Sequence, residues 1–227
     1  MKLRTVRQTS VTLPALDDPG LRLVTVTSLD GPVRRAVEFS YADASLRELS
    51  LADTHLLDGW VLRLRTQRTV LENLRADSVE FSECELSSLR CSGGKLSRVV
   101  FSECKIMGGA FEDITFENVL FDKCRLDYTT FSRVRAAGPV VFSGCSLHEA
   151  TFASCDLGSA AFDTCTMEKT EFDSGRYAGF DLRGNDLSAV RGVSSLRRVI
   201  IDRPQVLQLA QALAEDLDVT FGEDLQG

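Results

Sequence analysis

Apolar residues recur at every fifth position of this chain from Leu46 to Leu187. The row keeps one frame as far as Ala136, slips by one residue through 137–141, and resumes at Phe142. Of the 29 positions in the two frames, 28 are apolar, and Thr66 is the exception. This period matches neither an α-helix, which repeats every 3.6 residues or so, nor a strand, which repeats about every two. It predicts a solenoid built from five-residue repeats.

The stacking of repeats predicts which side chains meet in the core. If four repeats close one square coil, residues 20 positions apart lie in neighbouring coils, about 4.8 Å from each other at the usual strand spacing. One such file contains Phe81, Phe101, Phe121, Phe142 and Phe162. Because a repeat centre faces the coil axis, we expect these rings to fill the core rather than to stack on bases or on a cofactor.

Two repeats carry a motif of their own: Cys155-Asp156-Leu157-Gly158-Ser159 and Phe180-Asp181-Leu182-Arg183-Gly184. They resemble the A-(D/N)-L-x-x unit of pentapeptide repeat proteins, and the resemblance covers about two thirds of the chain. It implies an all-β fold, a right-handed quadrilateral parallel β-helix (a pentapeptide-repeat solenoid), here followed by a short C-terminal α-helix. In such a coil the central residue of each repeat and the residue two before it point inward.

The repeat pattern divides the chain into three parts. We expect an irregular N-terminal cap over 1–40, with a strand over 21–26 that covers the first coil. The β-helix extends over 41–191, with about seven coils, an irregular segment at 60–69 around Trp60 and Thr66, and a bulge at 137–141 beside Pro139. Residues 192–227 are expected to form a C-terminal helical cap.

The C-terminal segment contains a helix signal. Asp202 is the expected N-cap, Gln205 reaches back to it as in a capping box, and the helix extends to about Asp216. One apolar stripe follows this helix at helical spacing; its members are Val206, Leu209, Leu213 and Leu217. The stripe has two interpretations: it covers the open edge of the last coil, or it joins two copies in a C2 dimer, as a C-terminal segment does in some pentapeptide repeat proteins.

Six of the seven cysteines occupy the same repeat position, two residues before a centre. Five of them are expected to stack in one file, namely Cys84, Cys104, Cys124, Cys145 and Cys165. A file of parallel thiols does not converge on one point, as tetrahedral zinc requires, and it suits a tight apolar interior. We therefore expect buried, unreactive thiols, with no disulfide and no metal.

The remaining chemistry is sparse. The chain has 227 residues and two histidines, His55 and His148, both at outward positions. It contains no phosphate-binding loop, no metalloprotease motif and no nucleophile elbow. It also contains no uncharged apolar stretch long enough to span a membrane. These observations predict a soluble, cytoplasmic protein that is not an enzyme and uses no cofactor.

Charge is the remaining functional signal. The net charge is −7 for the whole chain and −6 for residues 41–191, which disfavours direct binding to nucleic acid. Six carboxylates are assigned to the outer surface beside the Phe81 file, and we call them the acidic face: Glu80, Glu83, Glu103, Asp122, Asp163 and Asp181.

Some pentapeptide repeat proteins resemble B-DNA in size and charge and bind DNA gyrase in its place, conferring quinolone resistance. The resemblance thus implies a DNA-mimic modulator of a type II topoisomerase (DNA gyrase), with the acidic face standing in for phosphates. Duplex DNA as long as seven coils, roughly 34 Å, carries about 20 phosphate charges, far more than this surface. The alternative is a generic scaffold for protein–protein interaction whose partner the sequence does not identify.

Overall fold

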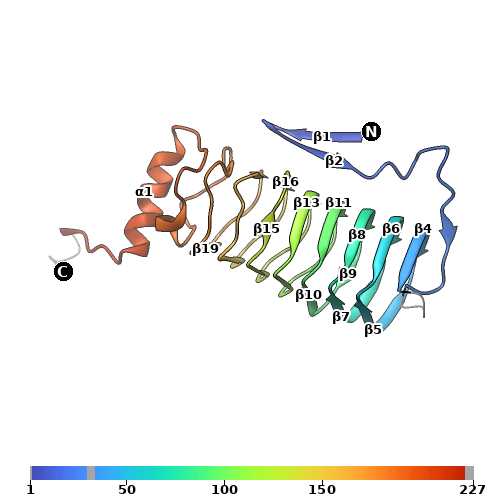
Figure 1. The fold of residues 1–227 in the computed structure, drawn as a ribbon. Coiled ribbons are helices and arrows are strands. Elements are labelled where there is room, and N and C mark those ends of the chain that lie inside the picture. Colours follow the sequence, from blue (N-terminus) through green and yellow to red (C-terminus); the bar gives the residue numbers. More distant parts are fainter. Residues whose placement is uncertain (1, 30–33, 223–227) are drawn as a thin grey trace.

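The computed structural model describes residues 2–29 and 34–222 of the chain. These residues form a parallel β-solenoid of about seven turns, followed by one short C-terminal α-helix that lies at the end of the last turn (Figure 1). An N-terminal hairpin lies along one side of the solenoid, and the chain then runs back to the far end to begin the first turn. The solenoid, the hairpin and the helix together determine which outer surfaces are free.

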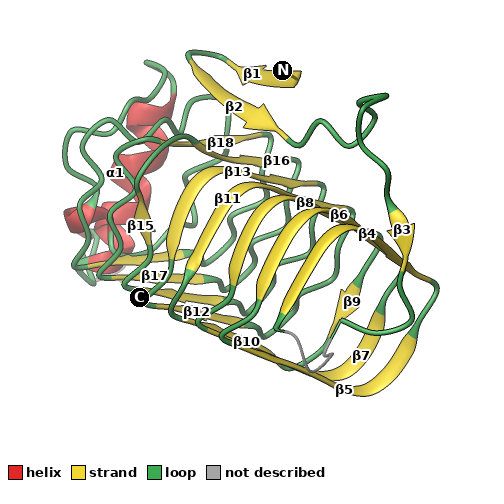
Figure 2. Cartoon of the chain, turned by 45° about the vertical axis from the view of Figure 1, so that its right-hand side comes forward, coloured by secondary structure: helices red, strands yellow, loops and turns green. Residues whose placement is uncertain are grey.

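Two parallel sheets wrap around the solenoid (Figure 2). The first contains β3 (Val24–Thr25), β4 (Arg35–Ala42), β6 (His55–Leu62), β8 (Arg75–Ser82), β11 (Lys95–Ser102), β13 (Thr115–Asp122), β16 (Val140–Ser143) and β18 (Ala160–Asp163), with β15 (Arg135–Ala136) beside β13. The second contains β5 (Ser45–Ala52), β7 (Arg65–Glu72), β10 (Leu89–Ser92), β12 (Ala110–Glu112), β14 (Thr130–Ser132), β17 (Thr151–Ala153) and β19 (Glu171–Asp173), with β9 (Glu85–Leu86) beside β7.

Four described elements lie outside these sheets. Strands β1 (Lys2–Val6) and β2 (Thr9–Leu13) pair antiparallel as a separate hairpin. A short 3-10 helix, η1 (Val193–Ser195), follows the last turn, and α1 (Gln205–Asp216) follows η1.

The corners of the solenoid are made by residues with left-handed backbone. In the first sheet one such residue lies at the middle of each eight-residue strand and bends it around a corner. These residues, with φ between 48° and 55°, are Glu38, Asp58, Ser78, Arg98 and Asn118. L-residues other than Gly, Asn and Asp adopt this conformation at a cost, so the regular packing of the interior must hold the corners in place.

Neighbouring turns pair in a register of 20 residues. Phe81 lies opposite Phe101, which in turn lies opposite Phe121. The rings stack with centroid distances of 5.0 Å and 4.9 Å and near-parallel planes. Offset stacking of this kind contributes about 0.5–1.5 kcal/mol per pair beyond the burial of apolar area. The predicted Phe file is therefore confirmed as a ladder in the core.

A second ladder interlocks with the first. Phe111, Phe131, Phe152 and Phe172 stack at 5.0, 4.6 and 5.3 Å. The two ladders meet edge to face, as between Phe111 and Phe121, whose centroids lie 6.0 Å apart at 83°. Side chains from facing walls therefore fill the axis of the solenoid and leave no channel along the described ladders.

The bulge at 137–141 is confirmed by the register. Ala136 lies opposite Phe116, a step of 20, whereas Val140 lies opposite Val119, a step of 21. The Ser159 hydroxyl of the next turn donates to the carbonyl of Gly138 over 2.7 Å. One extra residue is thus accommodated at a corner, and the ladders continue on both sides of it.

The irregular segment expected at 60–69 was a wrong prediction, because these residues belong to the regular strands β6 and β7. Thr66 points inward like every other repeat centre and is buried. Its hydroxyl shares a hydrogen bond of 2.6 Å with the hydroxyl of Thr69, which is buried beside it. Because the two hydroxyls satisfy each other, a polar centre fits the core without distorting the coil.

The stacked thiols are buried, as predicted. Each donates to the carbonyl of a residue one turn earlier: Cys104 Sγ to Phe81 over 3.3 Å, and Cys124 Sγ to Phe101 over 3.2 Å. Three polar side chains at this inward position do the same: Thr129 donates to the carbonyl of Ile106 over 2.8 Å, Thr170 to that of Leu147 over 2.7 Å, and Asn185 to that of Phe162 over 2.9 Å. Where this position holds a cysteine, the thiol therefore fits the interior with its donor satisfied.

The N-terminal segment differs from the expected cap. β3 pairs with β4 and covers the first coil, so this part of the cap is present, although it is shorter than the strand expected over 21–26. Residues 2–13, however, form the hairpin, which lies on the middle and last turns instead of on the first (Figures 1 and 2). Residues 35–40, which were expected to belong to the cap, are instead part of β4 in the first sheet. Residues 1 and 30–33 of the expected cap lie outside the described residues, as do residues 223–227 of the C-terminal part.

Helix α1 extends to Asp216, as predicted, but its N-terminus differs in detail. The Gln205 side chain accepts a hydrogen bond from the Asp202 amide over 2.6 Å, which confirms the backward contact of the capping box. The Asp202 carboxylate does not cap the helix; it accepts from the amide of Gly184 over 3.1 Å. The helix begins one residue after Pro204.

Candidate protein-binding surfaces

The acidic face contains an apolar strip that the sequence analysis did not identify. Four outward residues of consecutive turns lie in one register, each directly before a Phe of the first ladder. We call them the apolar strip: Val100, Leu120, Val141 and Ala161. Glu80 precedes the strip in the same register, and Asp181 follows it. The carboxylates therefore mark the ends of an apolar surface.

The N-terminal hairpin covers this strip. Val6 and Val11 pack against its four members in one buried cluster, and Leu13 borders the cluster. Strand β2 contacts β11, β13 and β16. The Thr12 amide also donates to the side-chain oxygen of Asn118 over 2.9 Å. The strip is thus buried under residues that precede it by about 90 positions or more in the chain.

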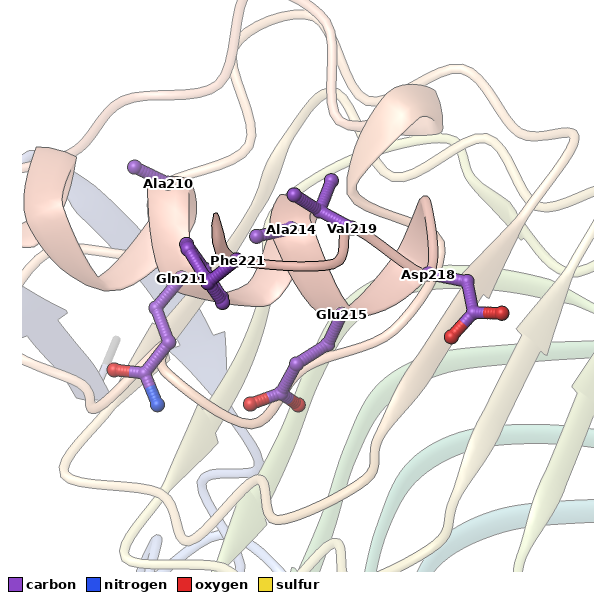
Figure 3. Close-up of a pocket in the computed structure, with 7 residues that line it drawn as sticks. All are labelled: Ala210, Gln211, Ala214, Glu215, Asp218, Val219 and Phe221. Atoms are coloured by element: carbon purple, nitrogen blue, oxygen red, sulfur yellow. The ribbon is translucent and has the colours of Figure 1, made fainter. Parts of the chain in front are cut away.

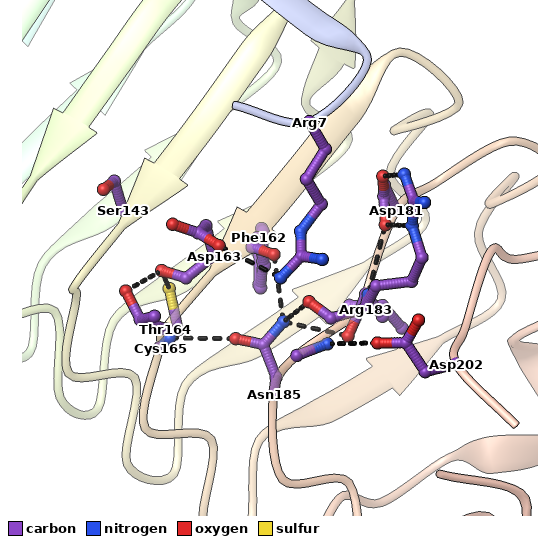
Figure 4. A network of polar contacts seen from close by, with 12 residues as sticks. Arg7, Ser143, Phe162, Asp163, Thr164, Cys165, Asp181, Arg183, Asn185 and Asp202 are labelled. Carbon is purple, nitrogen blue, oxygen red and sulfur yellow. Dashed lines mark hydrogen bonds and ion pairs between the residues drawn. The ribbon is translucent and has the colours of Figure 1, made fainter. Parts of the chain in front are cut away.

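Two arginines of the hairpin pair with the acidic face. The guanidinium of Arg4 lies 2.9 Å from Asp122 and donates to the hydroxyl of Ser143 over 3.1 Å. Arg7, at the hairpin turn, donates to Asp163 over 3.1 Å, as Figure 4 shows. The Asp122 side chain is only 15% exposed, and Arg4 is its charge partner. The hairpin therefore brings both apolar and cationic groups to the same surface.

The other four carboxylates of the acidic face also have partners. Glu80 accepts from the Trp60 indole over 3.3 Å and from the Ser82 hydroxyl over 2.9 Å. Glu103 lies 3.5 Å from the ammonium of Lys123.

Asp181 is buried beneath the guanidinium of Arg183, which donates to its two oxygens over 2.9 and 2.6 Å (Figure 4). Burial raises the pKa of Asp181, but the hydrogen bonds and charge of Arg183 outweigh it and hold that pKa below its ordinary value. Glu83 interacts electrostatically with Arg63. The pKa of Arg63 is raised mainly by the Asp43 carboxylate and more weakly by Glu83.

Ion pairs also occur elsewhere on the surface of the solenoid. Cations and carboxylates of neighbouring turns form ion pairs at 20-residue steps, as between Arg63 and Asp43 at 2.6 Å, Lys105 and Glu85 at 2.8 Å, and Arg133 and Asp113 at 2.6 Å. A phosphate backbone, in contrast, presents charges of one sign. The described surface is a mosaic of paired charges, and the acidic face is no bare row of carboxylates.

Helix α1 covers the last turn with one side. Ala212 is buried, and Leu209 packs against the core. The side chain of Gln205 donates to the carbonyls of Leu182 and Asn185, and Asp216 accepts from the Val193 amide. This side of the helix satisfies the backbone groups that the last turn would otherwise leave unpaired.

The predicted stripe of α1 therefore divides between two environments. Leu209 belongs to the cap, whereas Val206, Leu213 and Leu217 are exposed, Val206 at 54% and Leu217 at 65%. Leu207 is exposed at 79%. Beside them an open cleft of about 630 Å³ lies between α1 and the residues after it, lined by Ala210, Gln211, Ala214, Glu215, Asp218, Val219 and Phe221 (Figure 3). The end of the rod is thus an exposed apolar surface.

A signal for the covered strip was present in the sequence. The residue before each Phe of the first ladder is outward and ought to be polar, yet it is apolar in four consecutive turns. The charges on this surface do not by themselves reveal these four apolar residues. The hairpin had its own signal, since Val6, Val11 and Leu13 alternate with polar residues on both sides of the Arg7-Gln8 turn.

Across 2–29 and 34–222, no three His, Cys, Asp or Glu side chains are grouped as metal ligands would be. Over the same ranges, no helix has the length and apolar character needed to cross a membrane.

Comparison with solved structures found similar chains. Trypsin-treated QnrB1, a plasmid-mediated fluoroquinolone resistance protein, matches with 13% identity and a TM-score of 0.43, covering 77% of this chain and 97% of that one. Full-length QnrB1 matches with 14% identity and a TM-score of 0.41, covering 79% and 89%.

HetL, a pentapeptide repeat protein involved in heterocyst differentiation regulation in the cyanobacterium Nostoc sp. strain PCC 7120, matches with 14% identity and a TM-score of 0.38, covering 67% and 88%. No protein-family model and no curated protein matches the chain. Because the identities and TM-scores are this low, the fold assignment rests on the strand register of the chain itself.

Proposed function

We propose that this chain is a non-enzymatic, cytoplasmic protein-binding solenoid, and that its C-terminal helix joins two copies of it. The observation that carries the proposal is the division of α1 into two sides. One side, with Gln205 and Ala212, already covers the last turn. The other side leaves Val206, Leu213 and Leu217 in solvent, where apolar side chains of this size favour association. A second copy presents the same side, as a C2 interface requires.

Sedimentation velocity tests the dimer. We expect the wild-type chain of 25.0 kDa to sediment as a dimer, and a variant with Leu213→Glu and Leu217→Glu to sediment as a monomer with unchanged circular dichroism. The matched control, Val37→Glu with Met107→Glu, changes two exposed apolar residues away from α1 and is expected to remain dimeric. A monomeric wild type over the whole accessible concentration range excludes the dimer.

A finer candidate is a DNA-mimic modulator of a type II topoisomerase such as DNA gyrase. The observation that favours it is the rigid spacing of Glu80, Asp122 and Asp163 on one side of a rod whose residues 41–191 carry a net charge of −6. Their present pairing with Arg4, Arg7 and Trp60 weighs against it. Mimicry through this surface therefore requires the hairpin to leave it. A generic scaffold with another protein partner is the alternative, and neither needs direct binding to nucleic acid or to a membrane.

A supercoiling assay with DNA gyrase decides between these candidates. The protein is titrated with and without a quinolone, beside a variant in which Glu80, Glu103, Asp122 and Asp163 are changed to Lys. The control carries the same charge change on the second sheet, at Glu72, Glu112, Glu171 and Asp173. Inhibition or drug protection that only the first variant loses supports mimicry by the acidic face. If the wild type has no effect well above the enzyme concentration, the scaffold alternative is favoured.

A further inference from the structure

We propose that the apolar strip and its two flanking carboxylates, Asp122 and Asp163, form a docking surface for a basic β-strand of a partner protein. The N-terminal hairpin occupies this surface until such a strand displaces it. This inference rests on the proposed function as a protein-binding solenoid and names the chemistry of the partner segment.

The hairpin itself shows which ligand the surface accepts. Along β1, Arg4 and Val6 point toward the solenoid, and along β2 Val11 does, while Thr5, between Arg4 and Val6, and its strand partner Ser10 face solvent. A matching segment therefore alternates inward apolar or arginine residues with polar ones, which is the two-residue period of a strand. Arginine suits both carboxylates because its planar fork pairs with them directionally.

The contacts that hold the hairpin are few. Its apolar contribution is Val6, Val11 and the edge of Leu13, and its two ion pairs are partly open to solvent. Ion pairs of this kind contribute only about 0–1 kcal/mol each. An isolated two-stranded hairpin is marginally stable in water, so β1 and β2 depend on this surface for their order. The segment after β2 contains Pro14, Pro19 and Gly20 and forms turns, with no strand before β3.

The solenoid does not share this dependence. The first Phe ladder lies on the inner side of the same strands, and its rings contact one another and the second ladder. Removing the hairpin leaves those contacts unchanged, while it exposes four apolar residues and the largely buried Asp122. An exposed apolar surface bordered by carboxylates recruits a basic, apolar strand, since burial and charge complementarity then act together.

The test uses the full-length chain and one defined probe. The probe is a fluorescent peptide of residues 1–14, closed by a disulfide between cysteines added at its two ends so that the hairpin is held. The released variant carries Arg4→Glu, Arg7→Glu and Val11→Asp in the chain's own hairpin, and amide exchange reports whether β1 and β2 open. The control is Arg47→Glu with Arg90→Glu, two exposed cations away from this surface.

We expect the released variant to bind the probe at least about tenfold more tightly than the wild type or the control, by fluorescence anisotropy. Adding Leu120→Asp to the released variant abolishes that binding, and salt weakens it because the carboxylates take part. A probe carrying Arg4→Glu and Arg7→Glu is not bound.

Three results overturn the proposal. In the first, the amides of β1 and β2 stay protected in the released variant, which means that the hairpin cannot be displaced. In the second, the hairpin opens but the probe does not bind, which means that the surface accepts no strand from another molecule. In the third, the released variant associates with itself through the strip, which means that the occupant is a second copy. None of these results bears on the α1 dimer, which the Leu213 and Leu217 variant tests separately.

Discussion

The guanidinium of Arg7 donates to the carboxylate of Asp163 over 3.1 Å, and 156 residues of chain separate the two. The contact holds the turn of the N-terminal hairpin against β18, the last strand of the first sheet. Together with Arg4 and Asp122, it converts the acidic face into an internal interface. Surface charge counted from sequence therefore overstates what a partner meets.

Reversing one charge of this contact is expected to loosen the hairpin without unfolding the solenoid. Arg7→Glu replaces a partly exposed ion pair, which contributes at most about 1 kcal/mol, with two carboxylates that repel each other. It is measured as faster amide exchange in Thr9–Leu13, with unchanged exchange in β11 and β13. Exchanging the two charges, with Arg7→Glu and Asp163→Arg, is expected to restore part of the protection. Equal exchange in all three proteins contradicts a role for the contact.

Truncating a ring of the Phe ladder is expected to be far more costly. Phe121→Ala leaves a cavity between Phe101 and Phe142, whose centroids lie 4.9 and 4.6 Å from that of Phe121. The expected loss is about 3–5 kcal/mol of unfolding free energy, measured by urea denaturation. The control is Tyr128→Ala, which removes an exposed aromatic ring and is expected to cost less than about 1 kcal/mol. A loss at Phe121 no larger than at Tyr128 contradicts the inward assignment.

The cysteines are expected to resist thiol reagents in the native state. All seven are buried, and burial raises the pKa of Cys91 to about 12 and that of Cys155 to about 11. A thiol in this state supplies almost no thiolate near neutral pH. Titration with Ellman's reagent is expected to detect none of the seven before urea is added and all seven afterwards. Rapid reaction of a native thiol contradicts the packed interior.

Acid is expected to destabilise the fold through paired carboxylates. Hydrogen bonds from Arg133 lower the pKa of Asp113, and the ammonium of Lys105 lowers that of Glu85. Unfolded carboxyl groups titrate near about pH 4. Because the folded pKa values lie lower, the stabilisation is complete above that pH and is lost as the pH falls below it and through the folded pKa values. Burial raises the pKa of Asp58, so protonation of this one carboxyl at low pH favours the folded state instead.

The measurement is the melting temperature between about pH 6 and pH 3, at low and at high salt. We expect a fall below about pH 4 that is smaller at high salt, where exposed pairs are already screened. Replacing Asp113 by Asn is expected to lower the melting temperature at neutral pH and to weaken its dependence on acid. A melting temperature that stays constant down to about pH 3 contradicts the role of these pairs.

The solenoid could be predicted from sequence because each of its determinants is local. An inward apolar residue such as Phe121 occurs at every fifth position, whatever residues lie between. The pairing of neighbouring turns at a step of 20 residues follows from this period alone. The insertion beside Pro139 was likewise visible as a slip of the frame. The segment around Thr66 was wrongly expected to be irregular, because the Thr66 hydroxyl is hydrogen-bonded by that of Thr69. A polar residue at a repeat centre does not by itself show which residue pairs with it.

The binding surface was less accessible to sequence reasoning, because it depends on contacts between distant residues. The period assigns Val100 and Leu120 to the outside but does not say what covers them. The alternation of Val6 and Val11 predicts a strand pair without saying where it docks. Only the structure brings Arg4 to Asp122, and only it separates Leu209, which packs inward, from Leu213, which does not.

A methyl NOESY spectrum of the chain labelled at Leu and Val methyl groups, at low salt, tests directly whether the hairpin covers the apolar strip. We expect cross-peaks from Val11 to the methyls of Leu120 and Val141, which share its buried cluster. These cross-peaks are expected to weaken in the Arg4→Glu, Arg7→Glu, Val6→Asp variant, whereas those among Val99, Val119 and Val140 inside the solenoid remain. A wild-type spectrum in which Val11 shows contacts only within its own hairpin contradicts the covered strip, and with it the docking surface.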